Sequence, residues 1–527
     1  MAKPPPTSID DMARTTVRST MMWYLSFLAP LAIAFPLFPI KTTTPESCTQ
    51  MRASEWRQRS IYQIVTDRFA LPDGTTPERG LREHCGGTWK GIENRLDYIA
   101  GMGFDALWIS PVVHNLEENT TWGYGYHGYW ADDPFRLNDH FGTAEDLRSL
   151  SDALHARNMA LMVDVVINHL GINQPPDQLD YLHFPEPFNS PDAFHPNSPI
   201  NYNNQKSVED CWLVDAQPPL LADVNTENPD VLEAIVRSVV DLVQRYSIDG
   251  IRLDTARHVP QRHLERFQEA VNVFVTGEVL DGEVEYVAQY QRSMDSVLNY
   301  PLYFAINGVF AGNATFSTLQ DVINRERASF LDTTVLGNFL DNHDQARFAS
   351  KTGNNIAQDM NALTFIILAP GIPIVYYGFE QRLHGDKDPE NRAPLWSVGY
   401  NTDAPLYKLI AKLQAIKHIA RSSDIMSLFD EDLGQVLAIS DTTLAFQRGP
   451  LVTAVSKAQL DDDNNSSSNS TGLQLPRSAF NEGTQLIDLI SCEATTRAGV
   501  DGSFTVLHNT SSPEIWASRE LAGGLCF

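Results

Sequence analysis

Basic residues are scarce in this 527-residue chain. Its 39 Lys and Arg residues stand against 66 Asp and Glu residues, which gives a formal net charge of −27. A surface with this excess of negative charge repels phosphate backbones, so the composition argues against nucleic-acid binding. The charge is compatible with a neutral substrate that needs no electrostatic steering, and equally with acidity that only keeps the protein soluble.

Cysteine is sparse as well. The chain has five Cys residues, in no spacing typical of a metal site. So few in so long a chain exclude a small disulfide-stapled scaffold, and an odd number leaves at least one thiol unpaired within a monomer. Cys492 and Cys526 lie in the same terminal segment, and we expect these two to form a bridge.

Long apolar runs are also lacking, apart from residues 21–40 (MMWYLSFLAPLAIAFPLFPI), which carry no charge. Twenty helical residues would just cross a bilayer core of roughly 30 Å. The small residues at 32–34 (AIA) and the three prolines within the run favour a cleaved signal peptide instead. Both interpretations predict export, either as a secreted protein or as one anchored in the membrane through residues 21–40. Six Asn-X-Ser/Thr sequons fit a secretory route.

The following region alternates two kinds of segment. β-Branched runs predict buried strands at 106–109, 161–166 and 250–253. Amphipathic patterns predict helices at 144–157, 229–246 and 261–271. Strand–helix alternation over roughly 400 residues predicts a parallel sheet with helical crossovers, and at this length a (β/α)₈ TIM barrel.

Two segments break the alternation. Residues 171–226 are rich in Pro, Asn and Asp, and we predict an irregular subdomain inserted after the third barrel strand. From about Asp430 onward, short strand-like runs predict a C-terminal antiparallel β-sandwich domain. The predicted organisation is therefore a signal or anchor with its stem (1–50), a catalytic barrel (51–170 and 227–429), an inserted subdomain (171–226) and a C-terminal domain (430–527).

Acidic residues stand at the ends of predicted strands, where a barrel places its catalytic residues. The segments are 164–169 (DVVINH), 250–258 (GIRLDTARH), 277–281 (GEVLD) and 339–344 (FLDNHD). A single Asp at a strand end is more often a cap or turn residue. Three acids that each follow an apolar strand, Asp254, Glu278 and Asp344, indicate a carboxylate site.

In the second segment, 250–258, the spacing of the charged residues itself supports a catalytic role. Residues two apart on a strand face the same way, so Arg252 and Asp254 project together. A neighbouring guanidinium favours an ionised carboxylate, which a glycosidic nucleophile must be. A second carboxyl with a raised pKa then protonates the leaving oxygen. Glu278, which follows the apolar run 273–275, is the candidate for that group.

In order and in most residues, these segments resemble the four signature regions of the α-amylase family, glycoside hydrolase family 13. Further stretches are similar to secreted fungal α-amylases: 61–69 (IYQIVTDRF), 85–89 (CGGTW), 126–130 (YHGYW) and 208–213 (VEDCWL). The likeness is close over roughly residues 55–450 and looser beyond. It implies hydrolysis of internal α-1,4-glucosidic bonds in starch- or glycogen-type glucans, with retention of configuration.

The resemblance also implies roles for individual residues. Asp254 would be the nucleophile, Glu278 the general acid/base and Asp344 the third acid, which stabilises the transition state. The substrate-binding residues would be Arg252, His127, Tyr129, Trp130, His169, Arg257, His258, His343, Asp388 and Arg392. A Ca²⁺ site would use the Asn168, Glu209 and Asp223 side chains and the His258 carbonyl, oxygen ligands that suit this hard cation. We expect a monomer whose partner is its α-glucan substrate.

The chain departs from the fungal enzymes at a few positions. Arg257 stands where they usually carry Lys, so a planar fork replaces a flexible ammonium on the leaving-group side. Cys85 and Cys211 match half-cystines of those enzymes, but their partner positions are not Cys, and only Cys492–Cys526 is retained. Each lost bridge is expected to remove about 2–4 kcal/mol, which predicts lower resistance to heat.

Two other readings stay open. An α-glucan transglycosylase or α-glucosidase would use the same three acids, but the relatives that remodel cell-wall α-glucan look altered at the positions of His169 and His343, which are intact here. A non-catalytic, membrane-anchored partner, like the heavy chains of amino-acid transporters, would suit residues 21–40 and Cys48. Such a protein need not keep the three acids, so hydrolysis is favoured.

Overall fold

The computed structural model describes residues 53–74, 79–422, 429–457, 472–506, 512–523 and 525–526. The predicted signal or anchor at 21–40 lies outside these residues, as does Cys48. Among the described residues, no helix combines the length and the apolar character needed to cross a membrane.

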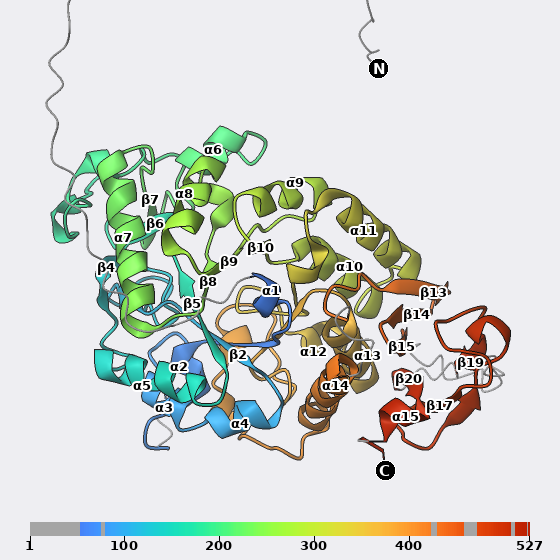
Figure 1. Cartoon of the computed structure of the whole chain (residues 1–527). Coiled ribbons are helices and arrows are strands. Elements are labelled where there is room, and N and C mark those ends of the chain that lie inside the picture. The colour runs from blue at the N-terminus through green and yellow to red at the C-terminus, as the bar shows by residue number, and fades with distance from the viewer. Residues whose placement is uncertain are drawn as a thin grey trace, which may run out of the picture. The chain divides into compact units, whose positions relative to one another are not determined.

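Eight parallel strands form the centre of the fold (Figure 1). They are β1 (Ile61–Ile64), β2 (Ala106–Ile109), β5 (Ala160–Val165), β8 (Gly250–Leu253), β9 (Phe274–Gly277), β10 (Ser296–Val297), β11 (Gly337–Asn338) and β12 (Ile372–Tyr376). Neighbours pair in sequence order from β1 to β10, and β1 and β11 both pair with β12. Between β10 and β11, Leu298 and Gly337 form a single parallel bridge, and the Asn299 N–H donates to the Gly337 carbonyl at 2.8 Å. The predicted (β/α)₈ barrel is confirmed.

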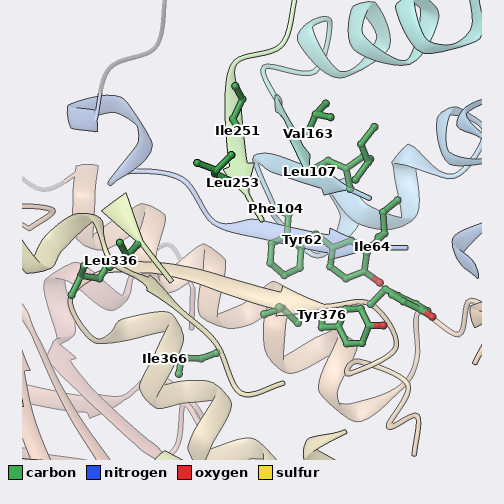
Figure 2. Packing of buried hydrophobic residues seen from close by; sticks show 14 of the residues in the cluster. Tyr62, Ile64, Phe104, Leu107, Val163, Ile251, Leu253, Leu336, Ile366 and Tyr376 are labelled. Carbon is green, nitrogen blue, oxygen red and sulfur yellow. The ribbon is translucent and has the colours of Figure 1, made fainter. Parts of the chain in front are cut away.

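Side chains of the barrel strands alternate between two apolar cores. Ile61, Ala106 and Trp108 belong to one cluster, which fills the barrel. Tyr62 and Leu107 belong to the other, which packs under the surrounding helices (Figure 2). Because both faces are covered, these strands read in the sequence as continuous apolar runs and not as alternating ones.

Helices connect and surround the strands. They are α3 (Trp89–Glu93), α4 (Leu96–Gly101), α5 (Ala144–His155), α7 (Pro229–Tyr246), α8 (Gln261–Val271), α9 (Val284–Ala288), α10 (Tyr300–Phe310), α11 (Phe316–Ser329), α13 (Ile356–Leu368) and α14 (Pro405–Ser422), with single turns at α1 (Ala53–Trp56), α2 (Thr66–Phe69) and α12 (Phe348–Lys351). Helices α7 and α8 have the predicted bounds, and α5 ends two residues earlier than predicted. A capping box at Thr143 and Asp146 starts α5, and Asn228 with Pro229 starts α7.

The insertion follows β5, the third barrel strand, as predicted. Its elements are β6 (His169–Ile172), the 3₁₀ turns Tyr181–His183 and Pro191–Ala193, α6 (Gln205–Asp210) and β7 (Leu220–Asp223). Strands β6 and β7 pair antiparallel, with His169 opposite Asp223. The shorter loop after β2 carries a second antiparallel pair, β3 (Val113–Asn115) and β4 (Ala131–Leu137).

The C-terminal region is antiparallel, as predicted. A six-stranded sheet has the order β13-β14-β15-β20-β17-β18, and β16 pairs with β19 beside it. The elements are β13 (Gln435–Ile439), β14 (Thr443–Arg448), β15 (Leu451–Ser456), β16 (Leu473–Leu475), β17 (Gln485–Asp488), β18 (Thr495–Arg497), β19 (Phe504–Val506), β20 (Glu514–Ser518) and α15 (Arg519–Ala522). Strand β15 packs on α13. The expected Cys492–Cys526 disulfide is present.

Candidate active site

A cavity of about 300 Å³ lies where the barrel strands end. Ten of the thirteen catalytic and substrate-binding candidates line it: Asp254, Glu278, Asp344, His127, Tyr129, Trp130, His169, His343, Asp388 and Arg392. The structure thus gathers side chains from loops that follow six different strands, as barrel topology allows.

Asp254 and Glu278 occupy equivalent positions on neighbouring strands. The register pairs Leu253 of β8 with Gly277 of β9, so each acid is the next residue after a paired one. Adjacent strands lie about 4.8 Å apart, which places the two carboxylates side by side. The Thr255 N–H donates to Glu278 Oε2 at 3.2 Å. Thr255 has φ 48°, a left-handed conformation that is rare for a β-branched residue and typical of strained functional sites.

Arg252 is fully buried, outside the cavity lining, and contacts three carboxylates. Its Nη1 is 2.6 Å from Asp254 Oδ1 and 3.0 Å from Asp164 Oδ1, and its Nη2 is 3.0 Å from Glu278 Oε2. Asp164 ends up there because β5 pairs Asp164 with Arg252. Burial raises the pKa of Asp254 well above its ordinary value, and attraction to Arg252 offsets only part of this rise. Arg252 therefore favours the ionised form of Asp254, as expected, but its guanidinium is shared among three acids and burial opposes it.

Asp344 has a different environment. Its Oδ2 is 3.0 Å from His343 Nε2, and its Oδ1 accepts a hydrogen bond from Arg392 Nη2 at 3.1 Å. Burial by itself would raise the pKa of Asp344, but His343 and Arg392 together hold it well below its ordinary value. Arg392 also reaches Asp388 Oδ1, at 3.1 Å. Asp344 is therefore held from two sides by groups that favour its ionised form.

The histidines in the cavity wall are oriented by their neighbours. His127 Nδ1 accepts a hydrogen bond from the Tyr129 N–H at 3.0 Å, which leaves Nε2 as the proton-bearing nitrogen. His169 Nε2 donates to the Tyr129 carbonyl at 3.1 Å, and its buried Nδ1 has no partner. Burial lowers the pKa of His127 well below its ordinary value and lowers that of His169 to about 4. Both rings are therefore neutral, one offering a donor and the other an acceptor.

Aromatic rings form another part of the lining. Tyr129 stacks on His343 with ring centroids 4.9 Å apart, and its hydroxyl donates to Asp164 Oδ2 at 2.7 Å. Trp130 meets His127 edge to face. The sequence analysis missed Trp122, which lines the cavity with 52% of its surface exposed. Its position in the aromatic-rich run 122–130 (WGYGYHGYW) could have identified it as a candidate from the sequence.

Arg257 and His258 lie outside the cavity lining. Arg257 Nη1 donates to the Leu280 carbonyl at 2.6 Å, and its Nη2 is 3.1 Å from Asp281 Oδ2. The guanidinium also lies over the rings of Tyr202 and Tyr286. Arg257 is therefore held by four partners. The role expected for it, on the leaving-group side, needs a side chain that reaches the substrate, and here the guanidinium is directed away from the cavity lining.

Oxygen atoms converge at the base of the insertion. The Asn168 side-chain oxygen faces Asp223 Oδ1 and the His258 carbonyl oxygen. If the amide is turned over, its nitrogen takes that place and donates to the two oxygens at 3.1 and 2.9 Å. Three oxygens this close need either a reversed amide or a cation between them, so the donor set fits an oxygen-binding metal ion. Glu209 is directed elsewhere: its Oε1 accepts from Gln205 Nε2 at 2.7 Å, and it lines a separate cavity.

Comparison with known proteins agrees with this geometry. The family model "Alpha amylase, catalytic domain" matches residues 63–429, and "Alpha-amylase, domain C" matches 436–527. Alpha-amylase 1 from Schwanniomyces occidentalis is 43% identical over 90% of this chain and 92% of its own length. The α-amylase from Saccharomycopsis fibuligera is 39% identical over 95% of this chain and 98% of its own. The solved α-amylase of Malbranchea cinnamomea superposes with a TM-score of 0.84 at 42% identity, over 90% of this chain and 99% of that one. The chain belongs to the α-amylase family of glycoside hydrolases.

Proposed function

We propose that this protein is an endo-acting α-amylase, which hydrolyses internal α-1,4-glucosidic bonds of starch- or glycogen-type glucans with retention. The observation that carries the proposal is the pairing of Asp254 and Glu278 at one level of adjacent strands, with Asp344 lining the same cavity. A retaining mechanism requires the two carboxyl groups about 5–5.5 Å apart, and equivalent positions on adjacent strands are separated by a distance of that order.

The reaction is a double displacement. The Glu278 carboxyl gives its proton to the glycosidic oxygen while Asp254 Oδ attacks the anomeric carbon, so the carbon–oxygen bond breaks and a glucosyl–aspartyl ester forms. Glu278, now a carboxylate, takes a proton from water, whose oxygen attacks the same carbon and releases Asp254. Arg252 supports this division of roles, because its shortest contact with the three acids, 2.6 Å, is with Asp254 and favours the ionised form there.

The other cavity residues bind and orient the sugar in this proposal. Asp344, His127, His169 and His343 hydrogen-bond the hydroxyls of the glucosyl unit at the cleavage point, and Tyr129 and Trp130 supply its apolar contacts. Asp388 and Arg392 line the non-reducing side. An endo-acting enzyme must bind glucan on both sides of the scissile bond, and the exposed Trp122 offers a further surface for stacking.

We also propose Ca²⁺ at the converging oxygens of Asn168, Asp223 and the His258 carbonyl. The ion supplies structural charge there, since it would neutralise Asp223 and join the insertion to the loop after β8. Burial raises the pKa of Asp223 to about 7, and a bound cation would favour the ionised form of this carboxylate. Chelation with EGTA should lower the thermal midpoint, and added calcium should restore it. An unchanged midpoint would contradict the site.

The remaining features of the proposal rest on the sequence. We propose a monomer that is secreted after cleavage within residues 21–40, with the inserted subdomain at 171–226 and the C-terminal domain from 430. Uncleaved anchorage through residues 21–40 is the alternative, and N-terminal sequencing of the exported protein separates the two.

A maltoheptaoside blocked at its non-reducing end and carrying a reporter at its reducing end tests the function. An endo-acting hydrolase cleaves it, whereas an α-glucosidase cannot begin at the blocked end and a transglycosylase yields longer products. Asp254→Asn and Glu278→Gln should each lose at least about 10³-fold in kcat. Asp97→Asn, the same chemical change at a side chain 91% exposed, should leave activity unchanged. Proton NMR of the first product should show the α-anomer. Equal activity of Asp254→Asn and the parent would sink the enzymatic assignment, and a β-anomer would sink the retaining mechanism.

A further inference from the structure

A second group of metal-binding side chains lies in the insertion, away from the sugar cavity. His195, Asp210 and Glu227 each offer one ligand atom, and these atoms lie within 4.8 Å of one another. The three come from separate segments: His195 follows a 3₁₀ turn, Asp210 ends α6, and Glu227 stands just before α7. Only folding brings them together.

The imidazole of His195 is already oriented for coordination. Its Nδ1 is 2.6 Å from Asp223 Oδ2, and its Nε2 is 3.0 Å from Glu227 Oε2. Asp223 is 1% exposed, so the contact at Nδ1 is the fixed one. Nδ1–H donates to Asp223, and Nε2 points at the cluster, where a bound metal ion would take the place of the proton between Nε2 and Glu227. A carboxylate behind a histidine ligand is the usual arrangement in zinc sites, where it fixes the ring and raises its basicity.

We propose that His195 Nε2, Asp210 and Glu227 form a site for a divalent transition metal, with Zn²⁺ as its best-matched ion. One imidazole nitrogen with two carboxylates suits zinc, whereas the neighbouring all-oxygen group suits calcium. Tetrahedral bonds of about 2.0–2.2 Å put the ligand atoms roughly 3.4 Å apart. Side-chain rotation can bring atoms that are now up to 4.8 Å apart to that spacing, and water would complete the coordination.

Two cations now contact the cluster, and neither blocks it. Lys206 Nζ is 2.5 Å from Asp210, and Arg262 Nη2 is 2.7 Å from Glu227 Oε1. Both side chains are long and exposed, at 76% and 62%, and surface ion pairs of this kind contribute little stability. A divalent ion can therefore displace them at small cost.

The position of the site suggests what it does. Cys211, the residue after Asp210, matches a half-cystine of fungal α-amylases, and its sulfur here accepts a hydrogen bond from Ser198 Oγ at 3.1 Å. Ser198 lies three residues after His195. A metal bound by His195 and Asp210 would thus join the same two segments that a 198–211 disulfide would join, and it would stabilise the insertion in place of that bridge.

Metal content of the full-length protein tests the proposal directly. The protein is equilibrated with micromolar ZnCl₂ in excess calcium, freed of unbound metal by gel filtration, and assayed for zinc per chain and for its thermal midpoint. We expect one zinc per chain and a midpoint raised by zinc. Glu227→Gln and Asp210→Asn should each weaken zinc binding by more than about tenfold. Glu227 contacts His195 and Arg262, neither of which supplies an oxygen to the calcium group, so Glu227→Gln leaves the ligands of that group unchanged.

His155→Gln is the matched control, because the part-buried His155 Nε2 pairs with Asp249 at 2.8 Å but belongs to no such cluster in the described part of the chain. It should bind zinc like the parent. Cys211→Ser tests the nearby thiol as the ligand instead, and it too should bind zinc normally. Absence of zinc in the parent, equal zinc in Glu227→Gln, or loss of zinc only in Cys211→Ser would each overturn the proposal. None of these readouts depends on glucan hydrolysis.

Discussion

Replacing Arg252 by Met tests how the three buried acids are held. The change removes the only cation that directly contacts all of Asp164, Asp254 and Glu278 in the described residues. Each hydrogen bond between charged groups contributes about 1.5–3 kcal/mol, but the contacts share one guanidinium and do not add. Removal of one partner from a buried ion cluster typically costs about 3–5 kcal/mol, so we expect a loss of about 4 kcal/mol in the free energy of unfolding near neutral pH.

The pH dependence of that loss distinguishes the charge cluster from ordinary packing. Burial already raises the pKa of Asp164 and of Asp254, and loss of Arg252 raises both further. A carboxyl whose pKa is higher in the folded state stabilises the fold at low pH, and this contribution is lost as the pH rises through the folded-state pKa. The deficit of Arg252→Met should therefore be smaller at about pH 5 than at about pH 7, since ordinary Asp titrates near 3.9.

Urea unfolding followed by tryptophan fluorescence at the two pH values measures this deficit. Arg448→Met is the control: Arg448 is 2% exposed, and its hydrogen bonds go to the carbonyls of Leu368, Ala369 and Phe429, which do not titrate. Its deficit should be nearly equal at the two values. A loss in Arg252→Met that is absent, or equal at both pH values, would refute the reasoning.

Further outcomes are expected elsewhere in the site and in the thiols. Tyr129→Phe removes the 2.7 Å bond to Asp164 and should lower kcat/KM by about tenfold or more, read as initial rates on a maltooligosaccharide; an unchanged rate would show that the bond is not used. Trp122→Ala should raise KM for long glucans more than for maltotriose, because the ring lies at the cavity rim, and an equal change for both would argue against stacking there. Titration of denatured, unreduced protein should find the free thiols of Cys85 and Cys211; a result of no free thiol would contradict the bridge assignment.

Local pattern was enough to predict much of the fold. The bounds of α7 and α8 follow from helical periodicity and start signals, and the long barrel strands follow from unbroken apolar runs. Strands β10 and β11 have two residues each, too few to carry a periodic signal, and they are recognisable only through their neighbours in the barrel.

For the site, too, some residues could be predicted from local sequence and others could not. Asp254 and Glu278 could be placed from their strands, but the presence of Asp164 beside Arg252 depends on the register between β5 and β8, which no single segment encodes. The opposing effects of burial and of the neighbouring acids Asp164 and Glu278 on Asp254 have the same origin. Arg257 was assigned to substrate by its position in a motif, and its partners Tyr202 and Tyr286 come from distant segments.

The single bridge between β10 and β11 has a consequence for how the enzyme fails on heating. Asp254 and Glu278 lie on one side of this seam, whereas Asp344 follows β11 on the other side and is tied to Arg392 beyond β12. Local opening of the barrel wall at this single backbone bridge would separate Asp344 from Asp254 and Glu278 while most of the molecule stays folded. Inactivation would then run ahead of global unfolding, so that lost activity on warming and loss of tryptophan fluorescence would give different midpoints.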